Sequence, residues 1–139
     1  MAASGAEGRS IGLALDVAKR LISEEIEVAP GCAFVAPTLL RSDLLAWVYA
    51  LERDGTLTRA EAIARLDRMR GLRVRLLGDR VSQRRSMEIA AALGRADTYA
   101  AEYIAVASLQ AEVLVTTDTD LAREAVRFVR VTGLDALVG

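Results

Sequence analysis

Histidine is absent from the 139-residue chain, and cysteine occurs only once, at Cys32. The absence of histidine excludes Ser-His-Asp and Cys-His catalysis, imidazole proton transfer and His-ligated zinc. A single cysteine excludes thiolate zinc sites and internal disulfides, and it fits a protein of the reducing cytoplasm. Carboxylates and arginines are the main side chains left for chemistry. Carboxylates favour hard cations such as Mg²⁺ or Mn²⁺.

Lysine is equally scarce, because 17 of the 18 basic residues are arginines and the exception is Lys19. The formal net charge is −1, but the stretch 65–85 holds eight arginines and two acids, a net charge of +6, against −7 for the rest of the chain. Two interpretations of this stretch stay open. It is either a solvated helix face with ion pairs or a surface that contacts phosphates.

Long hydrophobic runs are missing as well. The first ten residues, MAASGAEGRS, lack the apolar centre of a signal peptide. The longest uncharged stretch, 28–40, has 13 residues and contains two prolines and a glycine; it is too short and too interrupted to span a bilayer. We therefore expect a cytoplasmic protein without a membrane segment, with 1–10 as a short polar tail and 11–139 as one domain.

Short apolar runs alternate with longer helical patterns along the chain, which predicts βα units and a parallel sheet covered by helices on both faces. Strands are expected at 11–15, 34–36, 74–77, 113–116 and 128–131, and helices at 17–25, 37–52, 59–70, 81–93, 98–110 and 118–123. The helix at 59–70 has the clearest start, because Thr58 and Glu61 fit a capping box. The sequence thus predicts a single α/β domain of three layers.

Three aspartates are expected near the carboxyl ends of the predicted strands, where open parallel sheets carry their sites. Asp16 directly follows the strand 11–15, and Asp118 comes two residues after the strand 113–116. Asp43 lies one to two turns into the helix after the strand 34–36, among apolar neighbours. From the sheet-facing side of that helix, its side chain would point back toward the strand ends. Each acid alone fits a helix cap or a surface charge, whereas three that converge indicate a divalent-metal site.

Two segments resemble the PIN-domain ribonucleases, especially the VapC toxins. They are APTLLRSD at 36–43 and TYAAEYIAVASLQAEVLVTTDTDLA at 98–122. The family pattern is a strand-end Asp, an AP-x-L-x-x-x-E helix, a Y-D-A-x-Y helix and a final V-T-x-D. The resemblance runs from Ile11 onward and implies a three-layer PIN-like domain with a central parallel sheet. It further implies a Mg²⁺- or Mn²⁺-dependent endoribonuclease, the toxin of a VapBC-type pair, which a VapB-like antitoxin holds inactive.

Three acids of this pattern have counterparts in the chain, and the V-T-x-D motif matches cleanly. Asp16 matches the strand-end aspartate, although the stretch between it and Asp43 is shorter than usual for the family. Asp43 takes the place of the helix glutamate, and Asp118 closes the V-T-x-D motif. The resemblance therefore implies that Asp16, Asp43 and Asp118 are the catalytic, metal-binding residues. Thr116 of the same motif is expected to order a ligand or a water behind the metal.

The fourth position departs from the pattern, because Ala100 stands where the family has the aspartate of Y-D-A-x-Y. Two nearby acids are candidates to replace the missing aspartate: Asp97 as a further metal ligand, and Asp120 as a residue that orients the ligands without contacting the metal. Glu102 lies about 200° round the helix from position 100 and is expected to point away. Metal affinity and activity thus stay open at this point. A degenerate, inactive PIN-like domain that binds RNA or protein is the alternative function.

Cleavage of a phosphodiester without histidine needs another source of hydroxide and of positive charge. A divalent ion provides both, since it lowers the pKa of its bound water and acts as a Lewis acid. Under the phosphate-contacting interpretation of 65–85, RNA is the partner and the contacts come from Arg73, Arg75, Arg80, Arg84 and Arg85.

The predicted helix 37–51 carries more apolar side chains than one buried stripe needs. We therefore expect part of it to be covered by a second copy of the chain, with a two-fold homodimer as the default. Trp47 and Tyr49 on this helix fit the core or the dimer contact better than base stacking.

Overall fold

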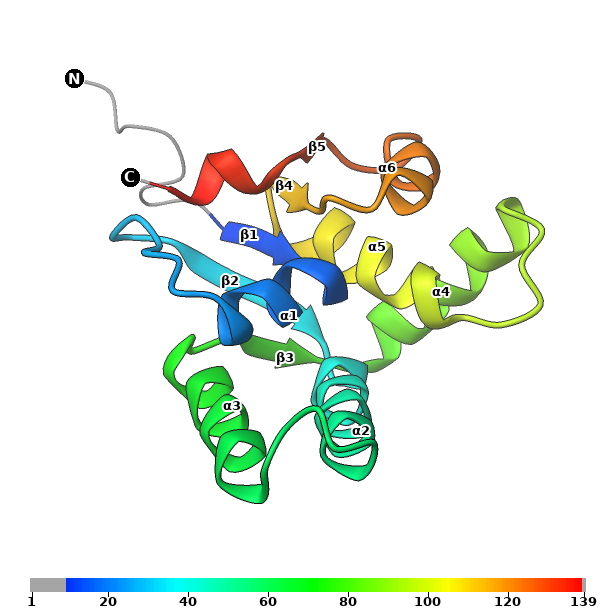
Figure 1. Cartoon of the computed structure of the whole chain (residues 1–139). Helices are drawn as coiled ribbons and strands as arrows, with labels where there is room; N and C mark the ends of the chain where they lie inside the picture. Colours follow the sequence, from blue (N-terminus) through cyan, green and yellow to red (C-terminus); the bar gives the residue numbers. More distant parts are fainter. Residues whose placement is uncertain (1–9, 139) are drawn as a thin grey trace.

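The computed structural model (Figure 1) describes residues 10–138, and within them five strands form one parallel sheet. The strands are β1 (Ser10–Leu13), β2 (Ala33–Pro37), β3 (Arg75–Leu77), β4 (Val113–Val115) and β5 (Val131–Thr132). Their order in the sheet is β3-β2-β1-β4-β5, and every neighbouring pair is parallel. The predicted α/β fold with a central parallel sheet is confirmed. The polar tail expected at 1–10 lies outside the described residues, except for Ser10, which begins β1.

Helices cover both faces of this sheet, which gives three layers. Residues 10–138 contain six α-helices and one 3₁₀ helix: α1 (Leu15–Ser23), α2 (Leu39–Arg53), α3 (Arg59–Gly71), α4 (Arg80–Ala92), α5 (Tyr99–Gln110), α6 (Thr119–Ala125) and η1 (Leu134–Leu137). Helices α1, α2 and α3 pack together on one face, while α5 lies against β1, β2 and β4 on the other with α4 beside it. No helix in this part of the chain is long and apolar enough to cross a membrane.

Alternate residues of the central strands enter two separate cores. Ile11, Leu13 and Val115 pack with α1 and α2, whereas Leu114 packs with α4 and α5. Because both faces of a covered parallel sheet are buried, such strands are continuous apolar runs. This explains why the apolar runs around β1, β2 and β4 predicted strands correctly.

Helix α5 lies unusually close to β1 because Gly12 has no side chain. A Cβ atom at Gly12 would lie 2.5 Å from the Cβ of Ala107. Since α5 precedes the parallel strand β4, its first turn lies at the carboxyl edge of the sheet. The close packing therefore fixes the first turn of α5, with Tyr99 and Ala100, beside the strand ends.

Several predicted boundaries differ from the structure by one to three residues, and the causes are clear at two of them. β1 ends at Leu13 rather than at residue 15, so Asp16 lies in the first turn of α1 and not directly after the strand. The last strand covers 131–132 rather than 128–131. The reason is that the amides of Phe128 and Val129 bond to the Ala125 carbonyl and extend the end of α6 as a turn.

Candidate active site

The crevice between the carboxyl ends of β1 and β4 is the switch point of the sheet, because the chain order reverses between these two strands. Open α/β sheets bind their ligands at such points. A cavity of about 440 Å³ opens there, and Asp16, Asp43 and Asp118 all line it. The remaining lining residues are Leu15, Lys19, Arg95, Tyr99, Ala100, Tyr103, Asp120, Leu121 and Glu124. The structure thus brings together the three acids that the sequence placed apart on three elements.

Three hydrogen bonds tie the carboxylate of Asp16 to the end of β4. The Thr116 hydroxyl donates to Oδ1 over 2.7 Å, and Thr117 donates to Oδ2 from its backbone N–H over 2.7 Å and from its hydroxyl over 2.8 Å. The Thr116 hydroxyl also accepts the backbone N–H of Asp118 at 3.1 Å. Because Thr116 is buried, this chain of bonds fixes the orientation of Asp16 relative to the backbone of Asp118.

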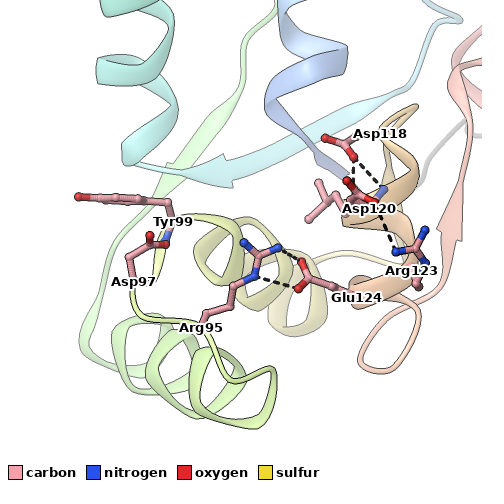
Figure 2. A network of polar contacts seen from close by, with 8 residues as sticks. Arg95, Asp97, Tyr99, Asp118, Asp120, Arg123 and Glu124 are labelled. Atoms are coloured by element: carbon pink, nitrogen blue, oxygen red, sulfur yellow. Dashed lines mark hydrogen bonds and ion pairs between the residues drawn. The ribbon is translucent and has the colours of Figure 1, made fainter.

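Asp118 is the N-cap residue of α6. Its Oδ1 atom accepts the backbone N–H groups of Asp120 and Leu121 at 2.9 and 3.1 Å (Figure 2). Within residues 10–138 no donor reaches Oδ2 of Asp118, so one carboxylate oxygen stays available to a ligand. Asp120 also lines the cavity and forms an exposed ion pair with Arg123 at 3.3 Å.

Asp43 reaches the cavity from α2, on the opposite side from Asp118. The hydroxyl of Tyr103, which is buried in α5, donates to Oδ2 of Asp43 over 2.9 Å. Burial, and secondarily the bond to Asp43, raises the pKa of Tyr103 well above its ordinary value. Tyr103 therefore keeps its proton and stays a donor. The sequence analysis missed this role; the signal was a second tyrosine one turn beyond Tyr99 on the same predicted helix.

The candidate substitutes for the acid missing at Ala100 are placed differently from one another. Ala100 itself lines the cavity, so α5 presents a methyl group where the family pattern has a carboxylate. Asp97 is not among the described residues that line the cavity; its Oδ1 accepts the Tyr99 N–H at 3.3 Å and caps the start of α5. Glu102 points into a different cavity, away from the acids as expected.

Two cations border the acids, and the sequence analysis assigned neither to the site. Arg95 makes a two-pronged contact with Glu124 of α6, through Nε at 2.8 Å and through Nη2 (Figure 2). The contact with Glu124 raises the pKa of Arg95 further. The Nζ atom of Lys19 lies 5.3 Å from the ring centre of Trp47. Arg95 and Glu124 are 29 residues apart, which is why no local sequence pattern could pair them.

As a donor set, these side chains suit a hard cation only in part. Oxygen atoms of carboxylates are the ligands that Mg²⁺ and Mn²⁺ prefer. Yet in the described part of the chain no group of three Asp, Glu, Cys or His side chains is placed to hold one ion. Both oxygens of Asp16 are bonded to threonines and one oxygen of Asp118 to α6. The type of ligand atom therefore suits Mg²⁺ or Mn²⁺, but within residues 10–138 no three acids are placed around one common point.

The arginines expected to contact RNA fall into two groups at opposite edges of the sheet. Arg73 and Arg75 lie at the amino end of β3, where Arg75 donates to Gln110 over 3.0 Å. Arg80, Arg84 and Arg85 lie on α4, which begins at the carboxyl edge. The α4 group is therefore on the same edge as the acids. Comparisons with known proteins add nothing to this placement, since no protein-family model and no curated protein matches the chain.

Proposed function

We propose that the chain is a PIN-like endoribonuclease that depends on Mg²⁺ or Mn²⁺ and belongs to the VapC toxins. One observation carries the proposal: Asp16, Asp43 and Asp118, from α1, α2 and the start of α6, line one cavity at the switch point of the sheet. A scaffold protein has no use for three acids in one cavity, because carboxylates that share a cavity repel one another.

In residues 10–138 no three acids are placed around one ion, and both oxygens of Asp16 accept from threonines. A bound ion would therefore draw on the free oxygens of Asp43 and Asp118 and on the remaining lone pairs of Asp16. The ion, when bound, lowers the pKa of its water and offsets charge on the phosphate. The threonines at the end of β4 orient Asp16, and the Tyr103 hydroxyl orients Asp43. The carboxylates of Asp16 and Asp43 are thereby held in one orientation before any ligand arrives.

Arg95 has a role in binding the substrate under this proposal. A phosphodiester is negatively charged, and four aspartates of the cavity would repel it. Arg95 is held by Glu124 through Nε and Nη2, so the N–H groups of Nη1 stay available for a phosphate oxygen. A planar guanidinium suits such contacts better than an ammonium group does. Glu124 therefore positions Arg95 at the edge of the acid cavity.

A second candidate function is an inactive PIN-like module that binds RNA or protein. It is favoured by Ala100 at the cavity wall and by the lack of a three-acid group in residues 10–138. The two functions differ in one measurable property, namely whether the unmodified chain cleaves RNA when Mn²⁺ is added.

Incubation of the purified chain with structured RNA and Mn²⁺ tests the proposal, with Asp118→Asn as the decisive variant. Asparagine caps helices about as well as aspartate does, so this change removes the charge and keeps the start of α6. We expect cleavage that Asp118→Asn reduces at least about 100-fold. Asp67→Asn on the exposed side of α3 is the matched control and should cleave normally. Absence of cleavage in the unmodified chain, or cleavage that survives Asp118→Asn, would overturn the catalytic proposal.

Partners follow from the same proposal: RNA as substrate, a VapB-like antitoxin as inhibitor, and a second copy of the chain, all in the cytoplasm. The dimer has support on α2, where Leu45 and Tyr49, one turn apart, are each 54% exposed. Large apolar side chains that share an exposed helix face mark an interaction surface. A monomeric mass in light scattering at about tens of micromolar would contradict the dimer, since obligate dimers persist at such concentrations.

A further inference from the structure

A second cavity, of about 370 Å³, opens at the same edge of the sheet, beyond the ends of β2 and β3. Its lining combines apolar and polar side chains: Pro37, Thr38, Leu77, Gly78, Ser82, Gln83, Ser86, Met87, Thr98, Glu102 and Val106. The first turns of α5 separate it from the acid cavity, because Thr98 and Glu102 face one cavity and Tyr99 and Tyr103 the other. The distance across such a wall is about 10 Å, the diameter of a helix with its side chains.

Buried polar groups are concentrated at this second cavity. Within residues 10–138 the buried polar side chains are Ser82, Ser86 and Thr116, and the first two line it. Their hydroxyl protons are already donated, from Ser82 to the Asp79 carbonyl at 3.0 Å and from Ser86 to the Ser82 carbonyl at 2.7 Å. Each oxygen can still accept a hydrogen bond. The two serine oxygens at the cavity wall can therefore accept from a ligand that carries donors.

Glu102 is the charged acceptor of this cavity. It is half-buried, and the Thr98 hydroxyl donates to its Oε2 atom over 2.8 Å, which fixes the carboxylate. With the oxygens of Ser82 and Ser86, the lining is richer in acceptors than in donors. A ligand with N–H donors on a partly apolar body therefore suits this cavity.

The exposed face of α4 carries side chains that could contact the phosphates and the ring of a nucleotide. Arg80, Gln83, Arg84 and Met87 follow one another at the i, i+3, i+4, i+7 spacing of a single helix face. Gln83 and Met87 line the cavity, and Met87 is 67% exposed at its mouth. A thioether packs well against an aromatic ring, while the two exposed arginines beside it can contact phosphates.

We infer that this second cavity binds a guanine base of single-stranded RNA, with Glu102 accepting from its N1–H and N2–H groups. Single-stranded bases are recognised on such edges. Guanine is the base with two adjacent donors there, whereas adenine, cytosine and uracil place an acceptor next to each donor. In the proposed ribonuclease, on which this step rests, the guanosine would lie beside the phosphate that is cleaved.

Binding measured without cleavage tests the inference. Four fluorescein-labelled RNA hexamers are compared: hexauridine, and hexauridine with one central uridine replaced by guanosine, adenosine or cytidine. The full chain carrying Asp118→Asn is titrated into each, and fluorescence anisotropy is recorded. We expect the guanosine hexamer to bind at least about fivefold more tightly, as a two-bond base contact provides. Adding Glu102→Gln, which can still accept from Thr98, should reduce this ratio to near one. Glu25→Gln, the same charge change on an exposed residue beyond the end of α1, should leave the ratio unchanged.

Equal affinities for the four hexamers, or a guanosine preference that Glu102→Gln does not reduce, would overturn the inference. Amide NMR shifts with guanosine monophosphate provide the second measurement, and shifts confined to the acid cavity would also overturn it. A guanosine preference in a chain that does not cleave RNA would contradict the proposed function and leave the base site standing. Cleavage without any base preference would contradict the base site and leave the proposed function standing.

Discussion

The two walls of the acid cavity are built in different ways. On the sheet wall, Asp16 is bonded three times by Thr116 and Thr117, and Thr116 in turn accepts from the backbone of Asp118. On the helix wall, the single bond that Asp43 accepts from residues 10–138 comes from the Tyr103 hydroxyl. Beside it α5 presents the methyl group of Ala100 where the family pattern has a carboxylate. One wall is fixed through backbone and buried hydroxyl groups, and the other depends on how α2 packs against α5.

This difference explains why the acids converge without forming a three-acid group in residues 10–138. The sheet wall can orient one acid well, but it holds that acid by using both of its oxygens. The helix wall would have to provide the further ligand, and at Ala100 it does not. Under the proposed function, the carboxylate missing from the helix wall is what a stronger metal site would need, while the sheet wall orients the acid that is already there.

Thr116→Val should break the sheet wall and have the largest effect. Valine has the shape of threonine but neither donates to Asp16 nor accepts from Asp118. We expect Mn²⁺ affinity to fall about 10–100-fold, as for other residues that orient ligands. The loss of a buried hydroxyl should also cost about 1–3 kcal/mol of stability. Calorimetric Mn²⁺ titration and urea unfolding measure the two effects.

Thr119→Val serves as the matched control for that variant, because Thr119 is exposed at the start of α6 and has no bond to Asp16. It should bind Mn²⁺ like the unmodified chain. Equal Mn²⁺ affinity in Thr116→Val and Thr119→Val would show that the sheet wall does not orient a metal ligand.

Ala100→Asp should complete the helix wall. The new carboxylate enters the cavity from α5, where Ala100 already lines it. Its attraction to a divalent ion is partly offset by desolvation and by repulsion from the other acids, so we expect about a tenfold gain in Mn²⁺ affinity. The gain is read from the Mn²⁺-dependent rise in melting temperature. Ala60→Asp, on the exposed start of α3, adds the same charge elsewhere and should give no gain.

Much of the fold could be predicted from the sequence because its signals are local. The capping box at Thr58 and Glu61 sets the start of α3. Gly55 and Gly94, both at positive φ, follow the ends of α2 and α4 where helices were expected to stop. Strand ends were less predictable, since β1 is followed at once by a helix that begins on apolar Leu15. An apolar run alone does not show where extended backbone ends.

The candidate site was predictable only where its residues occupy strand ends or repeat a family pattern. That reasoning placed Asp16, Asp43 and Asp118 at one cavity. It could not find the Arg95–Glu124 pair or the Tyr103–Asp43 bond, because these contacts join residues 29 and 60 positions apart. It also treated the arginines of 65–85 as one surface, while the turn of the chain through β3 sends them to opposite edges of the sheet.

Tyr103→Phe should weaken the helix wall with the smallest effect of the series. It removes the donor to Asp43 and keeps the buried ring, so we expect a loss of about 1 kcal/mol at neutral pH. It also changes the response to alkali. The pKa of Tyr103 is raised in the folded chain, whereas in the unfolded chain it is about 10.

The folded chain therefore retains a proton that the unfolded chain loses above about pH 10, and its stability falls as the pH rises further. Phenylalanine has no proton to lose, so Tyr103→Phe should remove this part of the alkaline loss while starting from a lower stability. Urea unfolding of both chains between about pH 7 and pH 11 measures the difference. The two stability curves should converge above about pH 10. Parallel curves over the whole range would mean that Tyr103 ionises as easily folded as unfolded, and the helix wall would then lack the fixed donor that orients Asp43.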